Sequence, residues 1–194
     1  GYGHGGHIFT SSDYGQHWTI QKGAGQHFWR DITIAKDPGD KGMHIAAVEY
    51  DTTGGGVYST TDNGEHWTST RTNAVEWTTV ASDPSGQFII AGVSSWDDGS
   101  STNKATVFCS KDYGATWSNL FERSGDNYAV TQVAADASKS EPKFYFVFLD
   151  GTESSIFTSQ CDIISWESFP QSFNGYIKIA PSNDGKNLAV GTDL

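Results

Sequence analysis

One eight-residue motif occurs four times at nearly constant spacing, and this periodicity constrains the fold of the chain more than any other feature. The complete copies read hydroxyl, any, Asp, any, Gly, any, any, Trp, and they lie at residues 11–18, 60–67 and 110–117. A degenerate copy at 159–166 keeps the hydroxyl and the Trp but has Cys161 and Ile163 in place of Asp and Gly. Successive copies are 49, 50 and 49 residues apart. A period of this length is typical of a solenoid, a propeller or another repeat array.

Each copy lies between two strand-like runs, so we expect it to form a hairpin turn. Gly supplies a positive φ without steric cost, while the Asp carboxylate and the hydroxyl accept hydrogen bonds from turn amides. The Trp is expected to cover apolar surface between neighbouring sheets. Identical residues in every repeat cannot all line one active site, so a structural role is favoured over a catalytic one. This role is assigned to Ser11, Asp13, Gly15, Trp18, Thr60, Asp62, Gly64, Trp67, Ser110, Asp112, Gly114, Trp117, Ser159 and Trp166.

The motif resembles the Asp-box, or BNR repeat, of sialidases and many other β-propellers. At the level of repeats the resemblance covers nearly the whole chain, and it implies a propeller of the sialidase-like superfamily. In that family the boxes lie on the face opposite the ligand site, and they occur in proteins of unrelated activity. The resemblance is therefore specific for the fold and says little about function.

Strand-like runs recur around each box, with about four strands in every ~50 residues, which is the signature of a propeller blade. Helical periodicity is absent, so we expect an all-β protein. The runs lie at 7–10, 17–21, 30–36, 43–50, 57–59, 67–71, 77–82, 87–94, 105–110, 128–135, 143–149, 155–159, 175–180 and 187–192.

The two ends of the chain predict how the propeller closes. Residues 175–180 and 187–192 supply the first two strands of a unit, and residues 7–10 and 17–21 supply the last two. Joined, they would form one composite blade, so we predict a single domain over 1–194 with four blades. Two alternatives remain open: a window cut from a longer array, and ends that pair with another copy of the chain to give a larger ring or a chain of subunits.

Composition excludes some partners. The net charge of −11 argues against binding to a nucleic-acid backbone. No run approaches the roughly 18 apolar residues of a membrane span. The chain lacks an initial Met and the apolar core of a signal peptide, which indicates a processed or trimmed product.

The two cysteines, Cys109 and Cys161, occupy different positions in their repeats. A disulfide between adjacent blades is possible, but sequence cannot fix the Cα separation that it requires. The Asp-box resemblance and the richness in Ser, Thr and Gly favour an extracellular or cell-surface location. The chain contains no N-x-[ST] sequon.

If the boxes mark one face, two sets of loops build the opposite face. One set joins strands within a blade, at 51–56, 95–104, 150–154 and the terminal junction of Asp193 with His4 and His7; the other joins blades, at 22–29, 71–76, 121–127 and 169–174. Aromatic faces beside carboxylates suit carbohydrate, because the sugar stacks while its hydroxyls form hydrogen bonds. The candidate ligand-binding residues are Trp96, Asp97, Asp98, Asp51, Arg71 and Arg123.

Catalysis is not supported by the residues. Resemblance to sialidases implies three Arg on a substrate carboxylate, a Tyr paired with Glu, and an acidic Asp; the Arg of this chain, at 30, 71 and 123, lack the Arg-Ile-Pro context of that family. A glycosidase of another kind needs two carboxylates across a cleft, and nothing in the sequence pairs them. We assign no catalytic residue, no cofactor and no metal site. His4 and His7 lie in a Gly-rich terminus, and 97–103 lacks the spacing of an EF-hand loop.

These observations predict a non-catalytic extracellular propeller that binds a glycan or a protein through the loops opposite the Asp-boxes. One alternative is a structural subunit of a filament or surface assembly that joins through its terminal strands. The other is a glycoside hydrolase of sialidase-like or xyloglucanase-like type.

Overall fold

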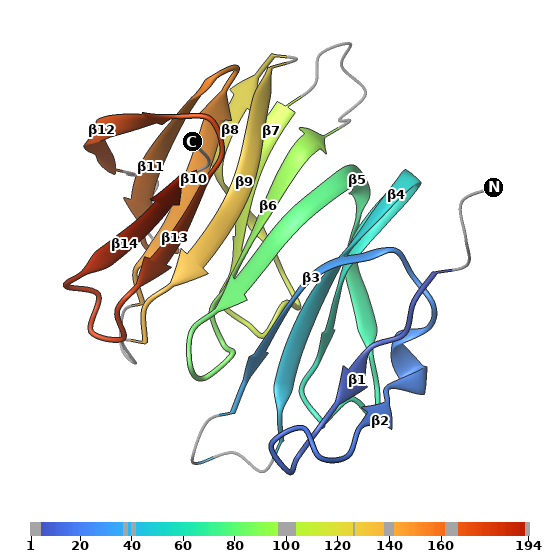
Figure 1. The fold of residues 1–194 in the computed structure, drawn as a ribbon. Helices are drawn as coiled ribbons and strands as arrows, with labels where there is room; N and C mark the ends of the chain where they lie inside the picture. Colours follow the sequence, from blue (N-terminus) through green and yellow to red (C-terminus); the bar gives the residue numbers. More distant parts are fainter. Residues whose placement is uncertain are drawn as a thin grey trace.

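The fold is built from antiparallel β-sheets (Figure 1). The computed structural model describes residues 5–36, 39, 42–96, 104–125, 127–137, 142–161 and 167–192, without the side chains of 52–54, 71–75 and 95–96. Within these ranges the helical structure is one three-residue 3₁₀ turn, η1 (Lys22–Ala24). The all-β prediction is therefore confirmed. None of the described residues forms a helix long and apolar enough to cross a membrane.

The described part of the chain contains fourteen strands, which belong to four hydrogen-bonded sheets. Their orders are β1-β2, β3-β4-β5-β6-β7-β8, β12-β11-β10-β9 and β13-β14. The strands are β1 (Phe9–Thr10), β2 (Thr19–Ile20), β3 (Trp29–Ala35), β4 (His44–Thr60), β5 (Thr68–Ser82), β6 (Ile89–Trp96), β7 (Lys104–Ser110), β8 (Ser118–Ser124), β9 (Tyr128–Ala135), β10 (Phe144–Asp150), β11 (Glu153–Ser159), β12 (Glu167–Asn174), β13 (Ile177–Pro181) and β14 (Leu188–Thr192).

The six-stranded sheet contains two blades, because β4 folds back on itself and β5 is shared between them, its start pairing with β4 and the rest with β6. The Tyr58 hydroxyl donates a hydrogen bond of 2.9 Å to Glu49, although nine extended residues would span about 30 Å. The first half of β4 pairs with β3 and its second half pairs with the start of β5. The rest of β5 pairs with β6, which continues through β7 to β8. The sheet β9–β12 forms a third blade.

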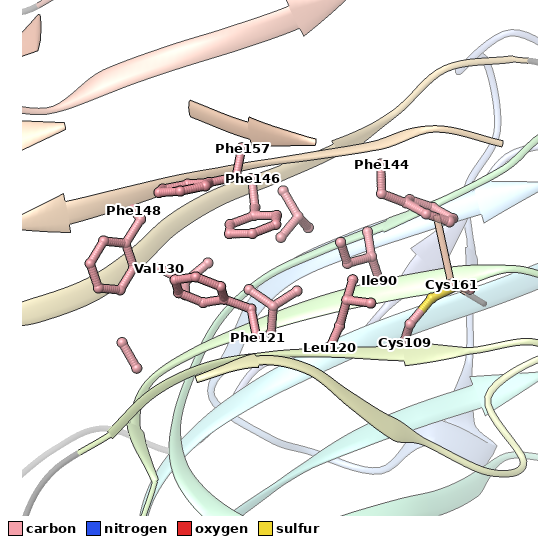
Figure 2. Packing of buried hydrophobic residues seen from close by; sticks show 13 residues of the cluster. Ile90, Cys109, Leu120, Phe121, Val130, Phe144, Phe146, Phe148, Phe157 and Cys161 are labelled. Carbon is pink, nitrogen blue, oxygen red and sulfur yellow. A yellow bond between two sulfur atoms is a disulfide. The ribbon is translucent and has the colours of Figure 1, made fainter. Parts of the chain in front are cut away.

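The largest core cluster lies between the second and third blades (Figure 2). Phe121 of β8 stands with its ring centroid 5.0 Å from that of Phe146 and 5.3 Å from those of Phe148 and Phe157. These rings come from β8, β10 and β11, so burying them fixes one blade against the next.

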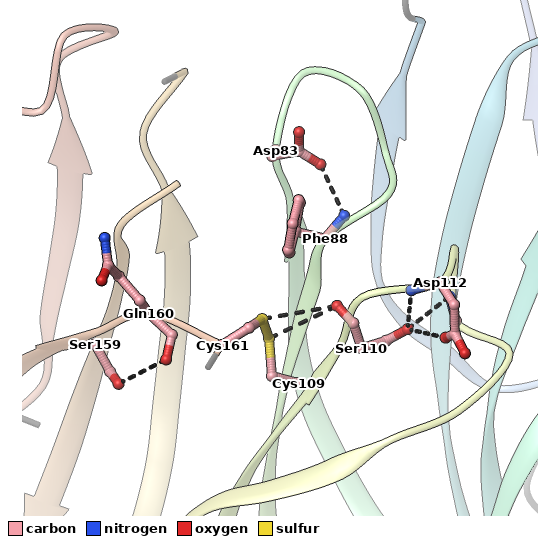
Figure 3. Close-up of a disulfide and its surroundings, with 9 residues drawn as sticks. Asp83, Phe88, Cys109, Ser110, Asp112, Ser159, Gln160 and Cys161 are labelled. Carbon is pink, nitrogen blue, oxygen red and sulfur yellow. Dashed lines mark hydrogen bonds between the residues drawn. A yellow bond between two sulfur atoms is a disulfide. The ribbon is translucent and has the colours of Figure 1, made fainter. Parts of the chain in front are cut away.

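A disulfide joins Cys109 to Cys161 at the edge of this cluster, with their Cα atoms 5.7 Å apart (Figure 3). Cys109 lies at the end of β7, and Cys161 follows β11 in the degenerate motif. The bond that the sequence left open therefore forms, and it links adjacent blades covalently.

The terminal hairpins do not join. Among the described residues β1-β2 and β13-β14 are separate two-stranded sheets, and Figure 1 shows them on different sides of the molecule. Each hairpin region instead packs on its own neighbour: Ile8 and Ala24 cluster with Ala47 of β4, while Ile177 and Ile179 cluster with residues of β10 and β11. The predicted composite blade is therefore not formed, and the count of four blades is not confirmed.

Three segments predicted as connections lie largely within strands. Residues 51–56 continue β4, residues 71–76 continue β5, and residues 169–174 belong to β12. The last segment contains Pro170, which a central strand would not accommodate. However, β12 is an edge strand and its pairing with β11 is irregular between Ser155 and Phe157, which is the setting in which a strand tolerates proline.

Candidate ligand-binding face

The Asp-box corners share one hydrogen-bond pattern, which the first copy illustrates. The Ser11 hydroxyl donates to Asp13 Oδ1 at 2.8 Å and accepts from the Gly15 amide at 2.8 Å. Asp13 Oδ1 also accepts from the His17 amide at 2.9 Å. The Trp18 indole N–H then donates to the Gly15 carbonyl at 3.0 Å, so the four motif residues form one closed turn.

The second and third copies repeat these contacts. Thr60 and Ser110 donate to their Asp at 2.7 and 2.8 Å, and Trp67 and Trp117 donate to Gly64 and Gly114 at 3.1 and 3.0 Å. The Gly64 position has a φ of +88° and lies against Gln21, whose Oε1 would be 2.0 Å from an added Cβ. In the degenerate copy Ser159 Oγ donates to the Gln160 carbonyl at 3.2 Å, and Trp166 lies outside the described residues.

The residue before each box glycine also has a positive φ, a feature that the sequence analysis missed. Tyr14, Asn63 and Tyr113 have φ values of 58°, 64° and 59°. This conformation costs free energy for a side chain other than glycine. Asn63 offsets part of that cost by accepting a 2.8 Å hydrogen bond from the Met43 amide.

Hydrogen bonds keep the box carboxylates ionised. Bonds from the His17 amide, the His17 side chain and Ser11 lower the pKa of Asp13 from 3.8 to about 2. The corresponding bonds from His66 and Thr60 lower the pKa of Asp62 further. Each of these two carboxylates is therefore held in its charged form by hydrogen bonds within its own turn.

A large cavity lies where the inner strands of the blades converge. Its volume is about 770 Å³, and β3, β5, β9 and β13 all contribute to its wall. The polar and aromatic residues that line it are Arg30, Tyr50, Glu76, Thr78, Ser94, Asn127, Tyr128, Thr131, Tyr176 and Lys178.

The cavity opens at the ends of the strands that are remote from the boxes. Arg30 and Tyr128 lie at the starts of β3 and β9, and Leu149 lies at the end of β10. The second and third boxes, in contrast, follow the ends of β4 and β7. Because neighbouring strands are antiparallel, the starts of inner strands and the ends of box-bearing strands lie at opposite edges of a blade.

Side-chain hydrogen bonds tie the inner strands together around the cavity. Asp31 Oδ2 of β3 accepts from the hydroxyl and the amide of β5 residues Thr79 and Val80, at 3.0 and 2.9 Å. The Thr79 hydroxyl accepts from the β9 amide of Val133 at 3.1 Å. Gln132 of β9 then bonds both backbone groups of Ile179 in β13, at 2.9 and 2.8 Å. The wall is therefore preorganised.

The described lining residues include two cations, Arg30 and Lys178, and one carboxylate, Glu76, in a chain whose net charge is −11. The Arg30 guanidinium lies 5.0 Å from the centroid of the Tyr50 ring, which holds it at the rim. Lys178 on β13 and Tyr176 just before it are exposed, and Glu76 is half-buried. A ligand with a carboxylate and apolar or aromatic groups would find complementary partners here.

Of the candidate residues chosen from sequence, the two whose side chains the structure describes, Asp51 and Arg123, are not among the residues that line this cavity. Asp51 follows the lining residue Tyr50 and is half-buried. Arg123 extends over the rings of Phe121 and Phe148, at 5.8 and 5.9 Å, and it covers the aromatic core. Trp96 and Arg71 lie in β6 and β5, with side chains that are not described. Asp97 and Asp98 lie outside the described residues.

The cavity residues lie mostly in strands, whereas the candidates predicted from sequence lie in segments expected to be loops. Each of three lining residues, Arg30, Tyr128 and Ile177, is the first or second residue of an inner strand. The inner strands of successive blades therefore bring them to the same cavity. Aligning the residues that open each inner strand would have identified Arg30, Glu76 and Tyr128 as neighbours. Nothing in their local composition distinguishes them from ordinary strand residues.

Comparisons with known proteins place the chain among propellers. The family model Sortilin-Vps10, described as sortilin, neurotensin receptor 3, matches residues 6–190. A crystal structure of a mutant NanB sialidase from Streptococcus pneumoniae is 12% identical with a TM-score of 0.50, over 92% of this chain and 31% of that one. A chain of a nidogen/laminin complex is 18% identical with a TM-score of 0.45, over 71% of this chain and 46% of that one.

The chain therefore spans less than half the length of either solved structure. The likeness to the sialidase supports the propeller fold alone. No curated protein sequence matches the chain.

Proposed function

Because the chain belongs to the Sortilin-Vps10 family, which its match over residues 6–190 shows, we propose that it is a non-catalytic domain that binds a protein ligand. The binding site is the cavity opposite the Asp-boxes, and residues 1–194 act as one binding domain. The observation that carries the proposal is a preorganised cavity of about 770 Å³ that presents Arg30, Lys178 and three tyrosines.

The residues of this cavity suit the binding of a peptide segment better than the hydrolysis of a glycoside. The family description names a neurotensin receptor, and Arg30 with Lys178 would pair with a carboxylate of such a peptide. Among the described lining residues Glu76 is the single carboxylate, whereas glycoside hydrolysis uses two.

A glycan is the second candidate ligand. Tyr50, Tyr128 and Tyr176 line the same cavity, and aromatic faces can stack on sugar rings. In either case we place the protein outside the cytosol, because a disulfide that joins two blades persists in an oxidising compartment.

The test is a binding measurement with a fluorescent neurotensin peptide and a library of random peptides, beside a glycan array. We expect at least tenfold weaker binding of selected peptides after the double change Arg30→Ala and Lys178→Ala. The matched control is Lys186→Ala, since Lys186 is an exposed cation at the β13-β14 turn, outside the cavity. Peptides that bind the double variant and the wild type equally, or a library without binders, would refute the protein-ligand proposal.

A further inference from the structure

We infer that the second Asp-box binds a divalent transition-metal ion such as Zn²⁺ through Asp62, Glu65 and His66. The three side chains offer ligand atoms that all lie within 4.8 Å of one another. This site is separate from the axial cavity and is independent of the proposed ligand-binding function.

The turn itself positions two of the ligands. Asp62 Oδ1 is occupied by the box, because it accepts from the Thr60 hydroxyl at 2.7 Å and from the His66 amide at 2.9 Å. Asp62 Oδ2 points instead to His66 Nδ1, 2.7 Å away. Two atoms bound to one Zn²⁺ at about 2.0–2.1 Å and at the tetrahedral angle are about 3.3 Å apart, so these two need to separate by about 0.6 Å. The pair can therefore chelate an ion with little movement, the imidazole proton being displaced.

The charge and chemistry of the trio match a divalent transition metal. Two carboxylates and a neutral imidazole carry a charge of −2, which the ion neutralises. One nitrogen and two oxygen ligands suit Zn²⁺, whereas Ca²⁺ takes six to eight oxygens.

The site is open to solvent, so an ion can enter and keep water as its remaining ligand. The His66 side chain is 87% exposed and that of Asp62 is 39% exposed. Both residues also line a groove of about 270 Å³ that reaches Asp112 and Tyr113 of the third box.

The other boxes provide controls within the same chain. The first box has the same Asp and His, 2.5 Å apart at Asp13 and His17, but Gln16 stands where Glu65 would be. The third box has Ala115 and Thr116 at the corresponding positions. The same corner thus offers three ligands in one copy, two in another and one in the last.

The test is calorimetric titration of the intact chain with Zn²⁺, with native mass spectrometry to count bound ions and Ca²⁺ as the comparison ion. We expect one equivalent of Zn²⁺, no comparable heat with Ca²⁺, and at least tenfold weaker binding in Glu65→Gln and in His66→Thr. Neither change touches the box Asp, and each copies a residue found in another box, so folding should be retained.

A gain of binding completes the test. Gln16→Glu gives the first box the ligand set of the second, and it should raise the count from one ion to two. Unchanged Zn²⁺ binding in Glu65→Gln and His66→Thr, or no second ion in Gln16→Glu, would overturn the inference.

Discussion

The first and third Asp-boxes make nearly the same hydrogen bonds in very different surroundings. The hydroxyl-to-glycine bond is 2.8 Å in the first and 2.9 Å in the third, and both indoles donate to the box glycine at 3.0 Å. Yet Trp18 is 63% exposed, while Trp117 lies 6.5 Å from Trp77 and also donates to Thr70 at 3.2 Å. Eight residues therefore suffice to form the corner, but its burial depends on another blade.

The order of packing explains the difference. Trp67 packs with Ile8 and Ala24, which precede its own blade, and Trp117 packs against a cluster that includes Val57 of the blade before. Trp67 and Trp117 thus each cover part of the preceding unit. Trp18, in the first described hairpin, is not part of such a cluster and stays largely exposed.

The largest effect that separates the two regions should come from removing the disulfide. Changing both Cys109 and Cys161 to Ser releases a loop of 52 residues, which the chain-entropy argument values at about 4 kcal/mol of unfolding free energy. Urea denaturation measures that loss. Hydrogen exchange should accelerate first at the Thr116 amide of the third box, while the His17 amide of the first is unaffected. A loss shared equally by both boxes would contradict the separation.

The second largest difference in unfolding free energy should come from replacing Trp117 or Trp18, the tryptophans of the third and first boxes. Trp117→Ala removes a ring packed against the core around Trp77, so we expect a loss of about 3 kcal/mol. Trp18→Ala should cost about 0.5 kcal/mol or less, because most of that ring already faces water. Thermal or chemical denaturation of the two variants gives the comparison. Similar losses would show that the indole hydrogen bond to glycine, and not burial, sets the contribution of the box Trp.

Local features of the fold were predictable from sequence, since a turn is determined by nearby residues. The positions of Asp13, Asp62 and Asp112, the strands between them and the absence of helical periodicity follow from an eight-residue motif and its spacing. The pairing between segments distant in the sequence could not be predicted from the motif. The composite blade was inferred by counting strands, whereas Ile8 and Ala24 near one end and Ile177 and Ile179 near the other pack on the nearest blade.

The candidate site shows the same limit. Arg30 and Tyr176 are 146 residues apart and share a cavity because their inner strands return to one axis. Loop composition favoured Arg123, yet its guanidinium lies over Phe121 and Phe148. Which polar residues meet at the axis depends on strand register and blade order, and neither is fixed by local sequence.

The smallest effect concerns acid. The pKa of Asp13 falls from 3.8 to about 2 chiefly through the His17 amide, so the folded corner prefers the ionised carboxylate. The stabilisation of the folded state by the ionised Asp13 carboxylate is complete above about pH 4. It is lost as the pH falls through the folded pKa near 2. NMR titration of the carboxyl carbon measures that value directly. His17→Thr should leave the pKa of Asp13 low, because the amide remains and a Thr hydroxyl can donate as Thr116 does to Asp112 in the third box. Ser11→Ala should raise it. A return of the pKa to near 3.8 in His17→Thr would mean that the imidazole, which the third box lacks, holds the first corner together.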